Sequence, residues 1–312
     1  KNTPGKFNAD HIALDNIIAN ISLKALRNDS INASIKRLSI TETHSGFDLN
    51  KLSMRAIGND KGMRIENFEI NLPHSVLRTD TIQLRYDSLD AFKDFVREVD
   101  FSFRMKPSRI SPKDLSAFLP AFNAFQETLE MEIKASGSID RLNCSRLSIS
   151  SPQKHFYLRG NASFQDLAHP ADAYIMASLS NLYADREGLA FLLRNFGAAN
   201  VSTIQNLGTV SFQGQLSGYF TDLVTYGRIQ TSLGNLNTDI KISKQEDRLA
   251  YSGKLETENF NLGSLTNNSK LGKITFNLDV NGNHRKQHYP QITMKGLIAS
   301  IEYSQYAYQN IT

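Results

Sequence analysis

The sequence predicts an all-β protein built as one elongated antiparallel sheet, and three observations carry this prediction. Apolar residues alternate with polar ones over many short runs, as in Ile274, Phe276, Leu278 and Val280. Because successive side chains of a strand point to opposite faces, such a run predicts a strand with one apolar and one polar face. Turn signals separate the runs, and no long helical pattern lies between most of them, which favours antiparallel pairing over βαβ units.

The predicted strands recur along most of the chain. Besides the run at 274–280, alternation is found at residues 68–72, 101–105, 131–135, 210–212, 240–242 and 297–301. Turn signals rich in Gly, Asn, Asp and Ser are found at residues 58–62, 136–137, 234–235 and 281–283. We therefore expect short strands joined by tight turns.

Three stretches have helical spacing of apolar residues instead. They are residues 89–99, 111–122 and 186–196. The second begins with Ser111 and Pro112, a helix-start pattern, although Pro120 should end or kink it early. In the third, Asp185 is the expected N-cap. Short amphipathic helices in a β protein usually close the end of a core. A membrane-interface role is disfavoured because these segments are short and lack a basic face.

Chain length alone suggests two domains, at about 150 residues each. The periodicity instead predicts one elongated β-repeat domain over 1–312, with an N-terminal sheet portion at 1–130 and a repeat portion at 131–312. The first two predicted helices belong to the N-terminal portion, and the third belongs to the repeat portion. Weak internal similarity between residues 135–142 and 215–223 supports stacked hairpins.

Composition excludes several classes of protein. Apolar residues make up 40% of the chain, charged residues 21%, and the net charge is +4. Disorder is therefore not expected. The basic residues are interspersed with acidic ones, so no nucleic-acid partner is expected. Cys144 is the single cysteine, which rules out an internal disulfide, and no apolar run approaches the ~20 residues of a spanning helix. The chain starts without Met, so we expect a piece of a longer protein whose targeting segment or anchor lies outside it.

No motif of catalysis or cofactor binding is present. The phosphate-binding loop, the dinucleotide fingerprint and the nucleophile elbow are all missing from the sequence. His284 and His288 are four residues apart, but Gly282, Asn283 and Pro290 favour a hydrated loop over a helical metal site. We predict a non-enzymatic protein with no catalytic, cofactor-binding or metal-binding residues.

Several phrases resemble the AsmA-like and TamB family of Gram-negative envelope proteins. The strongest are residues 253–265 and 270–276, where an Asn-Phe-Asn-Leu-Gly phrase precedes a Leu-Gly phrase and a strand ending in Asn281-Gly282. Residues 43–52, 72–77 and 301–311 are similar to other phrases of the family.

The resemblance implies an elongated, curved antiparallel sheet, a β-taco or trough. It implies a periplasmic location with an inner-membrane anchor outside this chain, and a role in moving phospholipid toward the outer membrane. Assistance to outer-membrane protein assembly is also implied, through an outer-membrane barrel partner that would bind regions absent here. The expected ligand is phospholipid or another acyl-chain lipid, and no cofactor is expected.

The apolar side of the predicted strands supplies the candidate lipid-groove residues. They are Phe101, Phe103, Val210, Phe212, Ile240, Ile242, Ile274, Phe276, Leu278 and Val280. A large exposed apolar surface usually marks a binding site. Three alternatives stay open at this point: a closed sandwich core, an envelope scaffold that recruits β-rich partners by strand addition, and a glycan- or peptide-cleaving β-enzyme.

Overall fold

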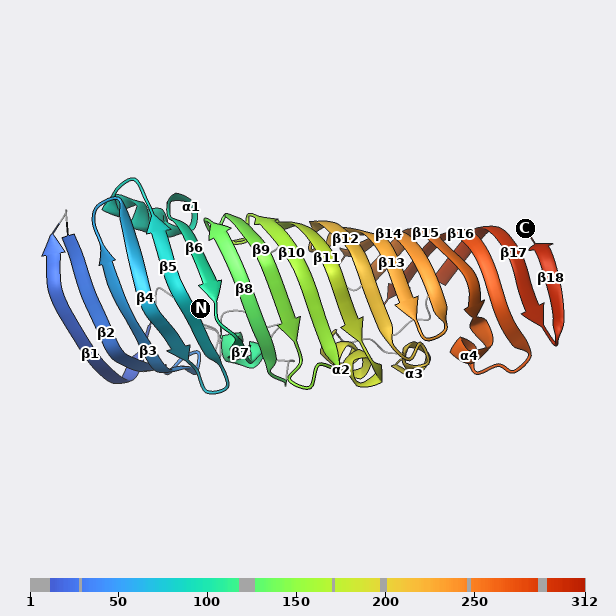
Figure 1. Ribbon diagram of the computed structural model, residues 1–312, viewed down its shortest axis with the longest axis horizontal. Helices are drawn as coiled ribbons and strands as arrows, with labels where there is room; N and C mark the ends of the chain where they lie inside the picture. Colours follow the sequence, from blue (N-terminus) through green and yellow to red (C-terminus); the bar gives the residue numbers. More distant parts are fainter. Residues whose placement is uncertain are drawn as a thin grey trace. The chain divides into compact units, whose positions relative to one another are not determined.

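The computed structural model describes residues 12–27, 30–117, 127–169, 172–196, 201–245, 248–285 and 291–311. Within these ranges it has eighteen β-strands and a few short helices (Figure 1). The chain divides into two compact units, Lys1–Gln153 and Lys154–Thr312. The all-β class, the antiparallel sheet and the few short helices predicted from the sequence are confirmed.

The first unit is an antiparallel succession of strands in chain order. Its strands are β1 (Leu14–Arg27), β2 (Ser30–Glu42), β3 (Phe47–Gly58), β4 (Gly62–Asn71), β5 (Val76–Arg85), β6 (Asp100–Met105), β7 (Ser108–Ile110), β8 (Leu129–Gly137) and β9 (Arg141–Ser150). The short strands β6 and β7 share one position in the sheet, because both pair with β5 on one side and with β8 on the other.

The second unit repeats this meander. Its strands are β10 (Phe156–Gln165), β11 (Tyr174–Ala184), β12 (Val210–Tyr219), β13 (Asp222–Thr231), β14 (Gly234–Gln245), β15 (Arg248–Asn261), β16 (Leu271–Arg285), β17 (Gln291–Tyr303) and β18 (Tyr306–Ile311). Each strand pairs antiparallel with the next one in the sequence. Each strand is therefore added to the sheet directly beside the strand that precedes it in the sequence.

The predicted helix at 89–99 is present as the 3₁₀ helix η1 (Leu89–Asp94) and the turn α1 (Phe95–Glu98). Both lie over the end of β5, where Leu84, Tyr86 and Val99 form a buried cluster against Phe101. The rings of Tyr86 and Phe92 meet edge to face with centroids 4.9 Å apart. The expected role as a plug for the end of the sheet is consistent with this packing.

The predicted helix at 111–122 is described only in its first part. Ser111 precedes the 3₁₀ helix η2 (Pro112–Leu115), with Pro112 at the first helical position as expected. Residues 118–122, including Pro120, lie outside the described residues.

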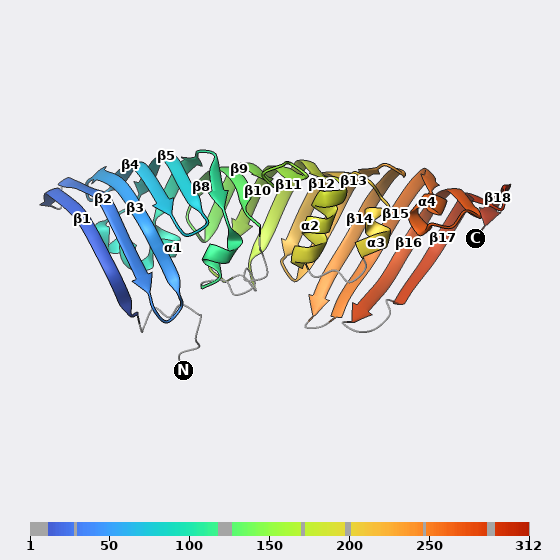
Figure 2. The same cartoon turned by 90° about the horizontal axis from the view of Figure 1, so that it is seen from below.

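The third predicted helix is α2 (Arg186–Phe196). Asp185 Oδ1 accepts hydrogen bonds from the backbone N–H groups of Glu187 (2.9 Å) and Gly188 (3.0 Å), which confirms the predicted N-cap. Two short helices were not predicted, α3 (Val201–Gln205) and α4 (Leu262–Thr266). In Figures 1 and 2, α2, α3 and α4 lie at the same end of the strands of the second unit.

The turn expected at 281–283 is wrong, because β16 continues through these residues to Arg285. Gly282 lies directly opposite Tyr251 of β15, and a Cβ on Gly282 would overlap the Tyr251 ring. Glycine at this position leaves room for the Tyr251 ring, and it does so within a continuing strand and not at a chain reversal. His284 accordingly lies in a strand, whereas His288 is outside the described residues.

Candidate functional site

Cross-strand pairing collects the apolar residues of the second unit on one face of its sheet. Residues directly opposite each other in an antiparallel pair have side chains on the same face. Leu278 lies opposite Leu255 and Gly296, and Val280 lies opposite Gly253 and Met294. Following the register from strand to strand defines what we call the apolar face: Leu158, Leu182, Val210, Phe212, Leu216, Leu223, Ile229, Leu236, Ile240, Ile242, Tyr251, Leu255, Ile274, Phe276, Leu278, Val280, Ile292 and Met294.

Eight of the ten groove residues predicted from the sequence belong to the apolar face. They are Val210, Phe212, Ile240, Ile242, Ile274, Phe276, Leu278 and Val280. They come from β12, β14 and β16, strands that are far apart in the sequence. Their contact with lipid stays a prediction.

The other two predicted residues, Phe101 and Phe103, lie side by side on β6 of the first unit. Their ring centroids are 6.0 Å apart. Phe103 lies opposite Ile82 and Ala135, so it also faces the apolar side of its own sheet. Phe101 packs against the buried cluster beneath η1 and α1, so part of its surface is already occupied by protein.

The apolar face is covered at one place and open at another. At its β10 side, α2 buries Leu189 and Phe191, and the rings of Phe156 and Phe191 lie 5.9 Å apart. On β16, Leu278 and Val280 are only 8% and 5% exposed. On the adjacent β17, Met294 is 56% exposed although it lies directly opposite Val280. The most exposed members of the apolar face, Ile292 and Met294, therefore lie on β17.

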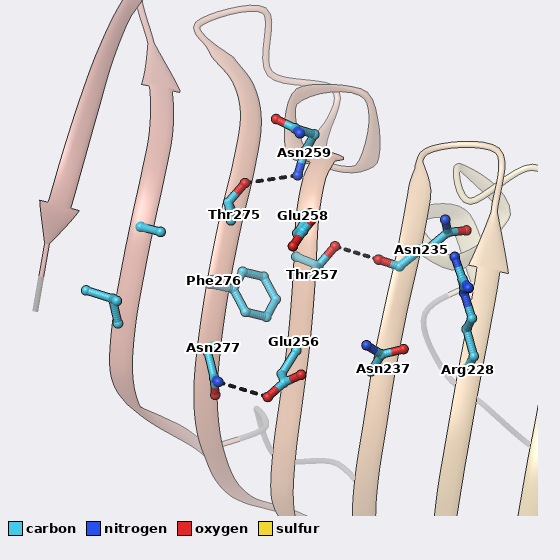
Figure 3. Close-up of a pocket in the computed structure, with 12 residues that line it drawn as sticks. Arg228, Asn235, Asn237, Glu256, Thr257, Glu258, Asn259, Thr275, Phe276 and Asn277 are labelled. Atoms are coloured by element: carbon cyan, nitrogen blue, oxygen red, sulfur yellow. Dashed lines mark hydrogen bonds between the residues drawn. The ribbon is translucent and has the colours of Figure 1, made fainter.

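The hollows of the second unit lie mainly on the opposite, polar face, although Phe276 of the apolar face also borders one of them. One has a volume of about 540 Å³ and is lined by residues of β13–β17, among them Arg228, Glu256 and Asn277 (Figure 3). The other, about 610 Å³, lies over β12–β15. Asn277 Nδ2 donates to Glu256 Oε1 at 2.8 Å. Sequence reasoning missed these hollows, although the polar half of the alternation, rich in Asn and Gln, was visible.

One histidine and two carboxylates meet at the start of α2. His155 Nδ1 lies 2.7 Å from Asp185 Oδ2, and His155 Nε2 lies 3.0 Å from Glu187 Oε2. The hydrogen bond to Asp185 raises the pKa of His155, and the charges of both carboxylates act in the same direction. Burial alone would raise the pKa of Asp185, but its hydrogen bonds from Gly188 N–H and His155 lower it. The arrangement is a helix cap whose charge depends on pH.

The surroundings of Cys144 and Glu42 favour structural roles for these two residues. Burial raises the pKa of the Cys144 thiol, which disfavours the reactive thiolate. Glu42 is nearly buried, and its carboxylate accepts from the Ser45 hydroxyl and N–H and from the N–H groups of Ala13 and His44. These bonds, led by the Ser45 hydroxyl, lower its pKa to about 2, and they close the β2–β3 turn.

Within the described ranges, no three His, Cys, Asp or Glu side chains are grouped so that they could hold a metal ion. None of the described helices has the length and apolar character needed to span a bilayer. The chain matches no protein-family profile, no curated protein and no solved structure. Any functional conclusion therefore depends on the faces of the sheet themselves.

Proposed function

We propose that the chain is a non-catalytic, periplasmic part of an AsmA- or TamB-like envelope protein. Its apolar face binds the acyl chains of phospholipid, or conducts them toward the outer membrane. The single observation that carries the proposal is the register of the second unit, which places side chains such as Phe212, Ile240 and Val280 on one face. An acyl chain needs a contiguous apolar surface and no catalytic group.

The exposed part of the apolar face supports this proposal further. Ile292 and Met294 on β17 are 51% and 56% exposed, beside the buried Leu278 and Val280. A lipid chain seated on β17 would cover these two side chains and extend the apolar contact of β16. Burial of apolar area at about 25 cal/mol per Å² would provide the binding energy.

Two neighbouring residues of β17 provide the sharpest test. Met294 lies on the apolar face, Thr293 points to the other face, and both are exposed, so a charge at either position should leave folding intact. The full chain is mixed with phosphatidylethanolamine–phosphatidylglycerol vesicles that contain a photoactivatable acyl chain. We expect Met294→Glu to reduce crosslinking severalfold and Thr293→Glu to leave it unchanged. Equal crosslinking in both variants and the parent would contradict the proposal.

Phe276→Glu extends the test to the half-buried part of the face, with Asn281→Glu on the exposed polar face of the same strand as its control. We expect loss of crosslinking only in Phe276→Glu. Lipid co-purifying with the parent chain is measured by mass spectrometry. Absence of any lipid, together with unchanged crosslinking in Phe276→Glu, would rule the proposal out.

Recruitment of β-rich partners by strand addition is a second candidate, favoured by one observation. β1 pairs only with β2 within the first unit, and its side chains Ile17, Ile18, Ile21, Leu23 and Leu26 are all more than half exposed. A long apolar strand of this kind is a template for pairing with another chain. Photocrosslinkers at Ile18 and at Lys36 on β2 would compare the two positions in cells. A β-rich envelope partner captured at Ile18 alone would support this function, and equal capture at both would count against it.

A further inference from the structure

The two hollows on the polar face of the second unit form one continuous depression. Arg228, Asn237 and Glu256 line both hollows, so the two hollows adjoin each other at these residues. We call this depression the polar hollow and define it by Gln213, Gln215, Tyr226, Arg228, Asn237, Asp239, Lys254, Glu256 and Asn277. Its two rows lie on the opposite side of the sheet from the apolar face. Phe276 of the apolar face also borders the hollow, whereas Met294 does not, so a charge at Met294 tests the lipid proposal without altering the polar hollow.

The register arranges these side chains in two straight rows across the strands. In the first row, Gln213, Arg228, Asn237, Glu256 and Asn277 are successive cross-strand partners from β12 to β16. In the second row, the corresponding partners are Gln215, Tyr226, Asp239 and Lys254. Neighbouring strands are about 4.8 Å apart. Polar groups are thus presented at regular intervals along a line that crosses the sheet.

Most of the hydrogen-bonding capacity of the polar hollow is unused by the protein. Among the described residues, the bond from Asn277 to Glu256 is the one side-chain hydrogen bond that involves a member of these rows. The polar face of the first unit is different. There Glu69 alone accepts from Lys51, Asn71 and Arg78. The donors and acceptors of the polar hollow remain available to a ligand.

Charge and strand position narrow the class of ligand. Arg228 and Lys254 stand against Asp239, Glu256 and Glu258 in the lining, a net charge of −1, so the hollow does not select a phosphate or another anion. β13 to β16 are each paired on both sides, so their backbones cannot take up a peptide by strand addition. The ring of Tyr226 is 66% exposed and stands in the second row. An amphipathic ring beside amides that both donate and accept suits a ligand with apolar C–H faces and many hydroxyl groups.

We infer that the polar hollow binds a neutral oligosaccharide, with the Tyr226 ring packing against a sugar ring and the row from Gln213 to Asn277 binding its hydroxyls. Titration calorimetry of the full chain with cellotetraose, chitotetraose and maltotetraose tests this inference. We expect at least one of them to bind in the millimolar range or tighter. We expect Tyr226→Ala to weaken that binding about tenfold or more, because the stacking surface is lost.

Tyr306→Ala is the matched control, because Tyr306 is also a strongly exposed tyrosine of the second unit but lies outside the hollow, on β18. Asn237→Ala, which removes an amide from the centre of the first row, should weaken binding while Tyr306→Ala does not. Lack of binding by all three neutral sugars would overturn the inference, as would equal weakening in Tyr226→Ala and Tyr306→Ala. Stronger, salt-sensitive binding of tetragalacturonate would also overturn it, because the hollow would then select anions. Met294→Glu should leave sugar binding intact, so failure of the lipid proposal and failure of this one are separable.

Discussion

The two faces of the second unit come from the same strands but differ in what covers them. On β16, Leu278 and Val280 are nearly buried, while Asn277, Asp279 and Asn281, which alternate with them, are exposed. Both faces are therefore formed by the same strands, and they differ only in which of the alternating side chains point to each side. A meander of this kind therefore presents two chemically different surfaces, one apolar and one polar.

The largest expected effect comes from placing a charge on the buried face. Leu278→Asp puts a carboxylate directly opposite Leu255 and Gly296, at a position that is only 8% exposed. We expect the free energy of unfolding to fall by about 3–5 kcal/mol. Asp279→Asn, one residue further on the exposed face, should change it by less than about 0.5 kcal/mol. Urea denaturation measures both, and similar losses would show that the faces do not differ in burial.

The next largest effect on stability is expected from substituting a glycine that has a positive φ on the apolar face. Gly253 has φ of +145°, and a Cβ at this position would overlap the carbonyl oxygen of Asp239 on β14. We expect Gly253→Ala to lower the free energy of unfolding by about 1–3 kcal/mol. Ser252→Ala, the adjacent substitution on the polar face, should have little effect. If both variants denature at the parent's urea concentration, Gly253 is not required by the close strand approach.

The faces of individual strands could be predicted from the sequence, because alternation is a local property. The run from Ile274 to Val280 alone indicates which of its residues share a face. Local composition gave a wrong prediction where a residue is chosen by a contact with a distant part of the chain. Asn281-Gly282-Asn283 has the composition of a turn, yet Gly282 is set by the ring of Tyr251 on another strand. The helix α4 has only five residues, too few for helical periodicity to be detected.

The two candidate sites also differ in whether they depend on local or non-local features of the sequence. The apolar face was predicted because every strand contributes its apolar half, whatever the pairing. The polar hollow depends on register across five strands, and a slip of one residue would reverse each assignment. Gln213 and Asn277 are 64 positions apart in the sequence, and nothing local indicates that they belong to one row.

The smallest expected effect concerns the helix that covers the apolar face, and it depends on pH. His155 contacts Asp185 and Glu187, and these contacts raise its pKa above the ordinary value. A group whose pKa is raised by folding stabilises the folded state fully below its unfolded pKa of about 6.5. That contribution is lost as the pH rises through the raised value. Arg186 also lies at this helix start, and Lys154 directly precedes His155 in the chain.

We therefore expect the parent chain to lose a small part of its stability between slightly acidic and alkaline pH, and His155→Gln to lack this step. Thermal unfolding measured across that range, with His169→Gln as the control, tests the expectation. His169 contacts Asp166 on an exposed turn at 2.7 Å, so it is a similar pair that does not cap a helix. If both variants retain the parent's pH dependence, the cap does not stabilise α2 through the charge of His155.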